Sequence, residues 1–170
     1  MRTIFVDGYN VINSWPGLRE TKNYSLDAAR QKLIELLQNY AAFKGCRIFI
    51  VFDAHLQPGS LQKKEKLSEN LFIVYTKEGE TADNYIEKTI DNMGRRTEVC
   101  VVTSDSLEQQ LVFQRGAVRM SSWEFYFEVK EAEKKISTKT QKKYSEKRDL
   151  LEDRIQKEVL EKLEKIRRSK

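Results

Sequence analysis

Four aspartates occupy equivalent positions along this chain, each where a predicted strand gives way to the connection after it. Asp7, Asp53 and Asp105 end short apolar runs, and Asp83 opens the helix predicted after another such run. In a parallel sheet, all strand-to-helix connections emerge at the carboxyl edge. We therefore expect the four carboxylates to lie close together, although about a hundred residues of sequence separate the first from the last.

A cluster of carboxylates indicates a cation, because like charges at short range repel and raise one another's pKa. Carboxylate oxygens suit Mg²⁺ or Mn²⁺, which keep several waters and also bind the phosphate oxygens of substrates. A metal-bound water of lowered pKa is a nucleophile for phosphodiester hydrolysis. We expect Asp7, Asp83 and Asp105 to be metal ligands, and Asp53 to ligate through water or to orient the nucleophile.

Each of these residues taken alone also has an ordinary structural explanation. A single aspartate after a strand is commonly a turn or helix-cap residue, so the prediction depends on the four positions together. Asn10 is either a turn or cap residue, or a side chain that supports Asp7 or contacts a substrate phosphate. Glu80 is either a solvated loop acid or a further ligand. Ser104 either caps the following helix or helps to bind phosphate at its first turn.

The elements that must position these acids alternate between strand and helix. This order predicts an α/β fold with right-handed crossovers and a mainly parallel sheet. The first strand, residues 3–6, is apolar throughout, as expected of a strand buried on both faces. Gly8 allows a tight turn and the close approach of another group. Further strands are predicted at residues 47–52, 71–75, 99–103 and 117–120.

Helix signals follow most of the strands. Ser25 is a predicted N-cap, with Asp27 in the first turn and Gly45 as the C-terminal stop. Thr81 is the predicted cap of the helix that carries Asp83. Further helices are predicted through residues 107–114, from Ser121 or Ser122, and as a long charged helix beyond residue 139. Residues 11–23 and 55–70 are expected to be loops.

The charge is unevenly distributed along the 170 residues. The net charge is +5, and residues 130–170 alone contain 15 basic and 9 acidic residues, a balance of +6. A near-neutral body with a basic extension is typical of a protein that binds a polyanion, although a solubilising charged helix has the same composition. We therefore divide the chain into a domain at residues 1–135 and a basic helical extension at 136–170.

Basic side chains elsewhere are candidate contacts to a phosphate backbone, although each one taken singly is typical of a solvated surface. These candidates are Lys63, Lys64, Lys66, Arg95, Arg96, Arg115 and Arg119. The single histidine, His55, does not support a histidine-dependent nuclease. Cys46 and Cys100 lie in or beside apolar runs and are expected to be reduced and buried. No apolar window is long enough to span a membrane, and no signal-like segment begins the chain, so we expect a cytoplasmic protein.

Four motifs in order resemble the NYN-domain family of the YacP type, which belongs with the PIN-like nucleases. They are Asp7-Gly8-Tyr9-Asn10, Val51-Phe52-Asp53-Ala54-His55, Glu80-Thr81-Ala82-Asp83 and Thr103-Ser104-Asp105. The similarity covers roughly residues 1–130. It implies a PIN-like α/β/α sandwich and a divalent-metal endoribonuclease that acts on single-stranded RNA.

The resemblance also implies catalytic or metal-binding roles for Asp7, Asp53, Asp83 and Asp105, with Asn10 as a supporting residue. Bacterial members of the family are associated with mRNA decay during translation, so mRNA and the ribosome are the partners it implies. The alternative is a non-catalytic RNA- or ribosome-binding module of the same fold. A phosphatase is disfavoured because Tyr9 stands where an Asp-x-Asp phosphatase has its second acid. The sequence does not indicate the oligomeric state.

Overall fold

The computed structural model describes residues 1–53, 63–93, 98–104 and 117–168. The chain divides into two compact units, Met1–Ala132 and Glu133–Lys170. The first unit contains the sheet, its covering helices and the start of the last helix. The second unit is the remainder of that helix. The helix predicted through residues 107–114 lies outside the described residues.

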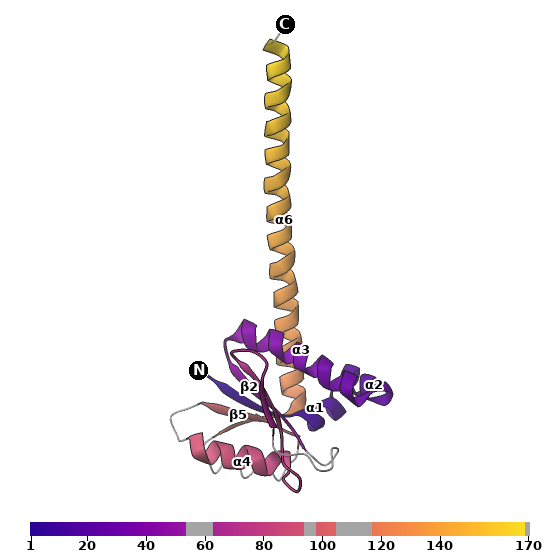
Figure 1. Ribbon diagram of the computed structural model, residues 1–170, viewed down its shortest axis with the longest axis vertical. Coiled ribbons are helices and arrows are strands. Elements are labelled where there is room, and N and C mark those ends of the chain that lie inside the picture. The colour runs from indigo at the N-terminus through magenta and orange to yellow at the C-terminus, as the bar shows by residue number, and fades with distance from the viewer. Residues whose placement is uncertain (54–62, 94–97, 105–116, 169–170) are drawn as a thin grey trace. The chain divides into compact units, whose positions relative to one another are not determined.

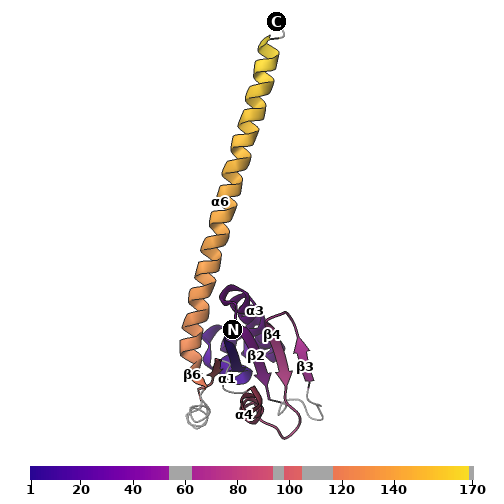
Figure 2. The same cartoon turned by 90° about the vertical axis from the view of Figure 1, so that its left-hand side faces the viewer.

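The first unit is built on a six-stranded sheet with the order β3-β4-β2-β1-β5-β6 (Figures 1 and 2). All neighbouring strands pair in parallel except β3, which is antiparallel to β4. The mainly parallel α/β fold is therefore confirmed. The strands are β1 (Thr3–Asp7), β2 (Arg47–Phe52), β3 (Lys63–Lys66), β4 (Leu71–Tyr75), β5 (Val99–Val102) and β6 (Val118–Met120).

Helices cover both faces of this sheet because its central strands are apolar on both sides. On one face, Ile4 and Val6 belong to a core shared with α3 (Leu26–Lys44) and the first turns of α6 (Ser122–Arg168). On the other face, Phe5 packs in a second core with α4 (Ala82–Met93). Figure 1 shows α3 and α4 on opposite sides of the sheet. The predicted burial of the first strand on both faces is confirmed.

The helix boundaries at Ser25 and Gly45 follow the predicted local signals. The Ser25 hydroxyl accepts the backbone N–H of Ala28 at 3.2 Å and so caps α3. Gly45 ends the helix in the left-handed region at φ 64°, where glycine is favoured. Ser121 similarly begins α6 with a reciprocal cap: its hydroxyl accepts the N–H of Glu124, whose carboxylate accepts the N–H of Ser121.

The predicted loop over residues 11–23 is wrong. The chain there forms two short helices, α1 (Gly8–Ser14) and α2 (Pro16–Tyr24), separated by one extended residue, Trp15. Pro16 suits the first helical position, and its ring disfavours a helical conformation for the residue before it. The Trp15 indole N–H donates to the Ser122 carbonyl oxygen at 2.9 Å, a contact across 107 residues. Pro16 is thus a local signal for a break at Trp15, whereas the carbonyl that anchors the indole is distant in sequence.

The predicted loop over residues 55–70 is wrong where the structure describes it. Lys63–Lys66 forms the edge strand β3, in register with Phe72–Tyr75 of β4. The Lys64 ammonium lies over the rings of Phe49 and Phe72, at 4.9 and 5.3 Å from their centroids. A lysine-rich run therefore serves as an edge strand, where charged side chains also discourage pairing with another sheet.

The last helix, α6, is continuous from Ser122 to Arg168, a length of 47 residues. It joins the helix predicted from Ser121 or Ser122 to the charged helix predicted beyond residue 139. Cys46 and Cys100 are free and buried, as predicted. Across the described ranges, no helix has the length and apolarity needed to cross a lipid bilayer.

Candidate active site

Three of the four predicted aspartates line one cleft of about 340 Å³ at the carboxyl edge of the sheet. Asp7 ends β1, Asp53 directly follows β2, and Asp83 lies in the first turn of α4. The strand-to-helix topology thus brings together side chains that are distant in sequence. The other residues that line the cleft are Tyr9, Asn13, Lys22, Leu26, Thr81 and Ala82.

Asp7 is held by the start of α1. Its carboxylate accepts the backbone N–H of Asn10 at 3.0 Å, which makes it the N-cap of that helix. Burial raises the pKa of Asp7 to about 6, and the negative charges of Asp83 and Asp53 add to the increase, while N–H groups of Asn10 and Tyr9 oppose it. A cation bound beside Asp7 would offset the repulsion between its carboxylate and the two neighbouring carboxylates.

Gly8 places this acid against the sheet by allowing a close approach. A Cβ atom built on Gly8 would lie 2.4 Å from Cε1 of Phe52, which is fully buried at the end of β2. Its φ is not in the left-handed region, so the requirement is for space rather than for backbone conformation. The group that approaches Gly8 closely, as the sequence predicted for some group, is therefore the ring of Phe52.

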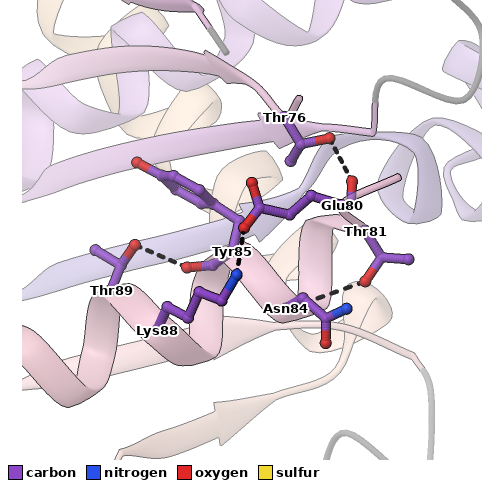
Figure 3. A network of polar contacts seen from close by, with 7 residues as sticks. All are labelled: Thr76, Glu80, Thr81, Asn84, Tyr85, Lys88 and Thr89. Atoms are coloured by element: carbon purple, nitrogen blue, oxygen red, sulfur yellow. Dashed lines mark hydrogen bonds and ion pairs between the residues drawn. The ribbon is translucent and has the colours of Figure 1, made fainter. Parts of the chain in front are cut away.

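Asp83 is positioned by the capped start of α4. The Thr81 hydroxyl accepts the backbone N–H of Asn84 at 3.2 Å, as expected of the predicted cap (Figure 3). One carboxylate oxygen of Asp83, Oδ1, is buried and has no hydrogen-bond partner within the described residues. A buried carboxylate oxygen without a donor is well suited to accept a cation.

Glu80 supports the turn that precedes α4. Only 7% of the residue is exposed, so the prediction of a solvated loop acid is wrong. Its carboxylate accepts the Lys88 ammonium at 2.8 Å, and its backbone oxygen accepts the Thr76 hydroxyl at 2.6 Å (Figure 3). Its second carboxylate oxygen is buried without a hydrogen-bond partner among the described residues. A role for Glu80 as a metal ligand stays a prediction.

We expect Glu80→Gln to lower the free energy of unfolding, with only a small effect on any activity at the cleft. The substitution keeps the shape of the side chain but removes the charge that holds Lys88. Because the Lys88 side chain is 65% exposed and returns to water, we expect a cost of about 0.5–1 kcal/mol in the free energy of unfolding. Urea denaturation measures this loss. Lys88→Gln is the matched variant at the other end of the ion pair. If the ion pair stabilises the fold, each single variant loses stability, and the double variant loses less than the sum of the two single losses. Additive losses would contradict the pair.

Asn10 contacts Asp7 through its backbone rather than through its side chain. Its N–H donates to the Asp7 carboxylate, while its side-chain Oδ1 is buried and has no hydrogen-bond partner in the described part of the chain. Ser104 is exposed just after β5, and Asp105, the fourth predicted acid, lies outside the described residues. Within the described ranges, no three acidic, histidine or cysteine side chains form a group able to hold an ion by themselves.

The donor set nevertheless fits a hard divalent cation. The three aspartates of the cleft offer only oxygen ligands, and Mg²⁺ commonly uses one or two carboxylates and completes its shell with water and substrate phosphate. A bound cation would give the unpartnered Oδ1 of Asp83 a partner and would offset the repulsion that helps to raise the pKa of Asp7.

Arg30 is an important residue of this region that no sequence motif indicated. Its guanidinium lies over the rings of Tyr9 and Phe52, donates to the Tyr9 hydroxyl, and pairs with Asp27 at 2.7 Å. Tyr9 thus lines the cleft with its hydroxyl held by α3. The arginine and its acid are three residues apart on a helix, a common surface pairing, so their spacing gave no sign of a role beside the cleft.

The four predicted RNA contacts that the structure describes do not lie together on one edge of the sheet. Lys63, Lys64 and Lys66 lie on β3, and Arg119 lies on β6, at opposite edges of the sheet (Figure 2). Lys63 pairs with Glu65. None of these four basic residues lines the cleft, whereas Lys22, which no motif indicated, does. The remaining candidates, Arg95, Arg96 and Arg115, lie outside the described residues, as does His55.

Comparisons with known proteins agree with this architecture. The sequence profile of the YacP-like NYN domain matches residues 4–168. The YacP protein of Bacillus subtilis (strain 168), itself uncharacterized, is 40% identical over 169 residues, which are 99% of this chain and 98% of that protein. The crystal structure of Rae1 (YacP) from the same species superposes with a TM-score of 0.75 at 37% identity, covering 99% of this chain and 95% of the other. A crystal structure of a point mutant of that protein gives a TM-score of 0.74 at 36% identity, with 85% of each chain covered.

Proposed function

Because this chain belongs to the YacP-like NYN domain family, we propose that it is a divalent-metal-dependent endoribonuclease that hydrolyses phosphodiester bonds in single-stranded RNA. NYN domains are generally nuclease-like, and the similarity to the family extends over nearly the whole chain. The observation that carries the proposal is the cleft in which Asp7, Asp53 and Asp83 converge, with the pKa of Asp7 raised to about 6.

Asp7 and Asp83 would hold Mg²⁺ or Mn²⁺, with Asp105 as the further ligand that the sequence predicts. When bound, such an ion supplies a water of lowered pKa as nucleophile and compensates the charge that develops on the phosphate oxygens. Asp53 would orient the nucleophile or ligate through water. These roles are the chemistry that carboxylates converging in one cleft can supply at neutral pH without a histidine.

The protein's own contribution is to hold these groups in place. The N–H of Asn10 fixes one oxygen of Asp7, and the Thr81 cap fixes the helix turn that carries Asp83. Asp7 is partly buried, so its interaction with a cation in the cleft is stronger than it would be at a fully exposed surface. Asn10 has a free side-chain oxygen among the described residues, consistent with the supporting role that the sequence predicts.

We propose mRNA as the substrate, the ribosome as a partner and the cytoplasm as the location. The family resemblance supports these assignments, and the basic extension supports a polyanionic partner. The test is incubation of the purified protein with end-labelled mRNA, with and without translating ribosomes, in Mg²⁺, Mn²⁺ or EDTA. Internal cuts that require metal and are absent from Asp7→Asn support the nuclease. Bound RNA or ribosomes without cuts under any condition would instead support the non-catalytic binding module.

Truncation after residue 135 is expected to weaken association with RNA or ribosomes while leaving the turnover of saturating substrate unchanged. The buried side chains described in α6 end with Ala132, so the core should survive the truncation, while most of the basic extension is removed. Affinity should fall about tenfold or more at low salt, with a shallower salt dependence. Filter binding and cleavage at saturating RNA measure the two quantities. A collapse of turnover would show instead that the extension is part of the active fold.

A further inference from the structure

The cleft has a second wall of different chemistry, formed by α1 and α2. Asn13 lies near the end of α1, and Lys22 lies in the last turn of α2. Both line the same cleft as the three aspartates. The Lys22 ammonium donates to Oδ1 of Asn13 at 2.6 Å, which links the two short helices at the edge of the cleft.

Lys22 is the only basic residue among the described residues that line the cleft. A lysine in a cleft with three carboxylates would be expected to pair with one of them. In the described ranges it pairs with none, and its contact is a neutral amide. None of the described carboxylates of the cleft therefore forms a direct ion pair with the Lys22 ammonium.

The hydrogen bond also determines which way the Asn13 amide faces. An ammonium group can only donate, so the atom of Asn13 that meets it must be the oxygen. The amide nitrogen of Asn13, with its two N–H donors, is then directed elsewhere, and the residue is exposed. Lys22 and Asn13 together present donors and a positive charge, which is the complement of a phosphate oxygen.

We propose that Lys22, held by Asn13, forms a phosphate-binding subsite for the RNA backbone on the α1–α2 wall. The subsite takes a phosphate neighbouring the one at the three carboxylates, so that the strand crosses the cleft from one wall to the other. The inference rests on the proposed function and names a binding residue for its substrate. A compact ammonium suits this task, because it attracts a backbone phosphate without selecting a base.

Binding of a single-stranded oligoribonucleotide tests the subsite in the Asp7→Asn background, where the RNA is not consumed. Lys22→Ala should weaken binding about tenfold at low salt and reduce the slope of log affinity against log salt by about 0.7, the value for one phosphate contact on a single strand. Lys22→Arg should retain the slope because it keeps the charge. Arg19→Ala is the matched control, since Arg19 is an exposed cation on the same helix that does not line the cleft.

Asn13→Ala separates the two members of the subsite. Without the amide oxygen, the lysine keeps its charge but loses its hydrogen bond, so we expect a smaller loss of affinity with the salt slope nearly unchanged. In the otherwise wild-type protein, Lys22→Ala should raise KM about tenfold and leave kcat unchanged, because the contact is to a phosphate that does not react. Circular dichroism of each variant confirms the fold.

The outcomes separate this subsite from the nuclease proposal. If the protein cleaves RNA with metal, but Lys22→Ala and Arg19→Ala have equal KM values and equal salt slopes, the subsite is overturned. The nuclease proposal is then unaffected. If the wild type binds RNA without cleaving it, and the salt slope of binding falls only in Lys22→Ala, the subsite is supported and the nuclease proposal is overturned. A protein that neither binds nor cuts RNA would overturn both.

Discussion

Asp7→Asn is expected to abolish metal-dependent RNA cleavage and, at neutral pH, to make the folded protein more stable. The loss of activity should be about 100-fold or more, since even residues that only support metal ligands typically cost about 10–100-fold when replaced. The fold should survive, because asparagine is as good an N-cap as aspartate and can still accept the N–H of Asn10. Cleavage at the wild-type rate would remove Asp7 from the site.

The gain in stability of Asp7→Asn follows from the upward shift of the Asp7 pKa in the folded protein. The folded protein holds this proton up to a pKa of about 6, against 3.8 for the ordinary side chain. As pH rises from about 4, the unfolded chain loses its proton first, so the folded state becomes relatively less stable until pH exceeds about 6. The penalty is then about 3 kcal/mol, and it is absent below a pH of about 4. Asp7→Asn should therefore gain stability at a pH of about 7–8 and almost none at about 3–4.

A divalent cation should relieve the same penalty in the wild type. Mg²⁺ that binds the folded cleft raises the Tm by mass action, and it does so most above a pH of about 6, where Asp7 is ionised. Thermal unfolding on either side of that pH, at about 5 and about 8, with Mg²⁺ or EDTA, measures the effect. Asp7→Asn is the control in which the shift should be small. An equal shift in both proteins would place the cation elsewhere.

Gly8→Ala is expected to destabilise the protein and to impair the site together. The new Cβ would meet the Phe52 ring at 2.4 Å, and Phe52 cannot move freely because it packs against Tyr9 and Tyr75 and under Arg30. Overpacking of this kind typically costs about 1–3 kcal/mol. Because Gly8 follows Asp7 directly, the backbone shift that relieves the clash also displaces the carboxylate, so cleavage should fall as well.

Gly17→Ala provides the matched control for this prediction. A Cβ atom added to Gly17, in α2, would approach only the tip of the Lys32 side chain, at 3.7 Å, so alanine has room there. Alanine is favoured over glycine within a helix by about 0.5–1 kcal/mol. Chemical denaturation should therefore show a loss for Gly8→Ala and no loss for Gly17→Ala. Adding Phe52→Leu to Gly8→Ala should recover part of the stability, and a failure to recover any would point to a cause other than the ring.

The sequence by itself determined the mainly parallel sheet, the positions of its five parallel strands, and the convergence of Asp7, Asp53 and Asp83. These features depend on local patterns. A short apolar run indicates a buried strand, a serine or threonine before a periodic segment indicates a cap, and the carboxyl edge follows from the alternation of elements. Ser25, Gly45 and Thr81 were predictable for the same reason, because each acts on its own neighbours in the chain.

Only the tertiary structure decided the features that depend on partners distant in sequence. The Trp15 indole between α1 and α2 is anchored by a carbonyl 107 residues away, and the strand at Lys63–Lys66 depends on β4 and on aromatic rings beneath Lys64. Whether Glu80 is solvated or buried depends on Lys88 and on the packing of α4. The position of Lys22 in the cleft follows from the two helices that form where the sequence predicted a loop. Such contacts are set by the packing of whole elements, and no local pattern of residue types specifies them.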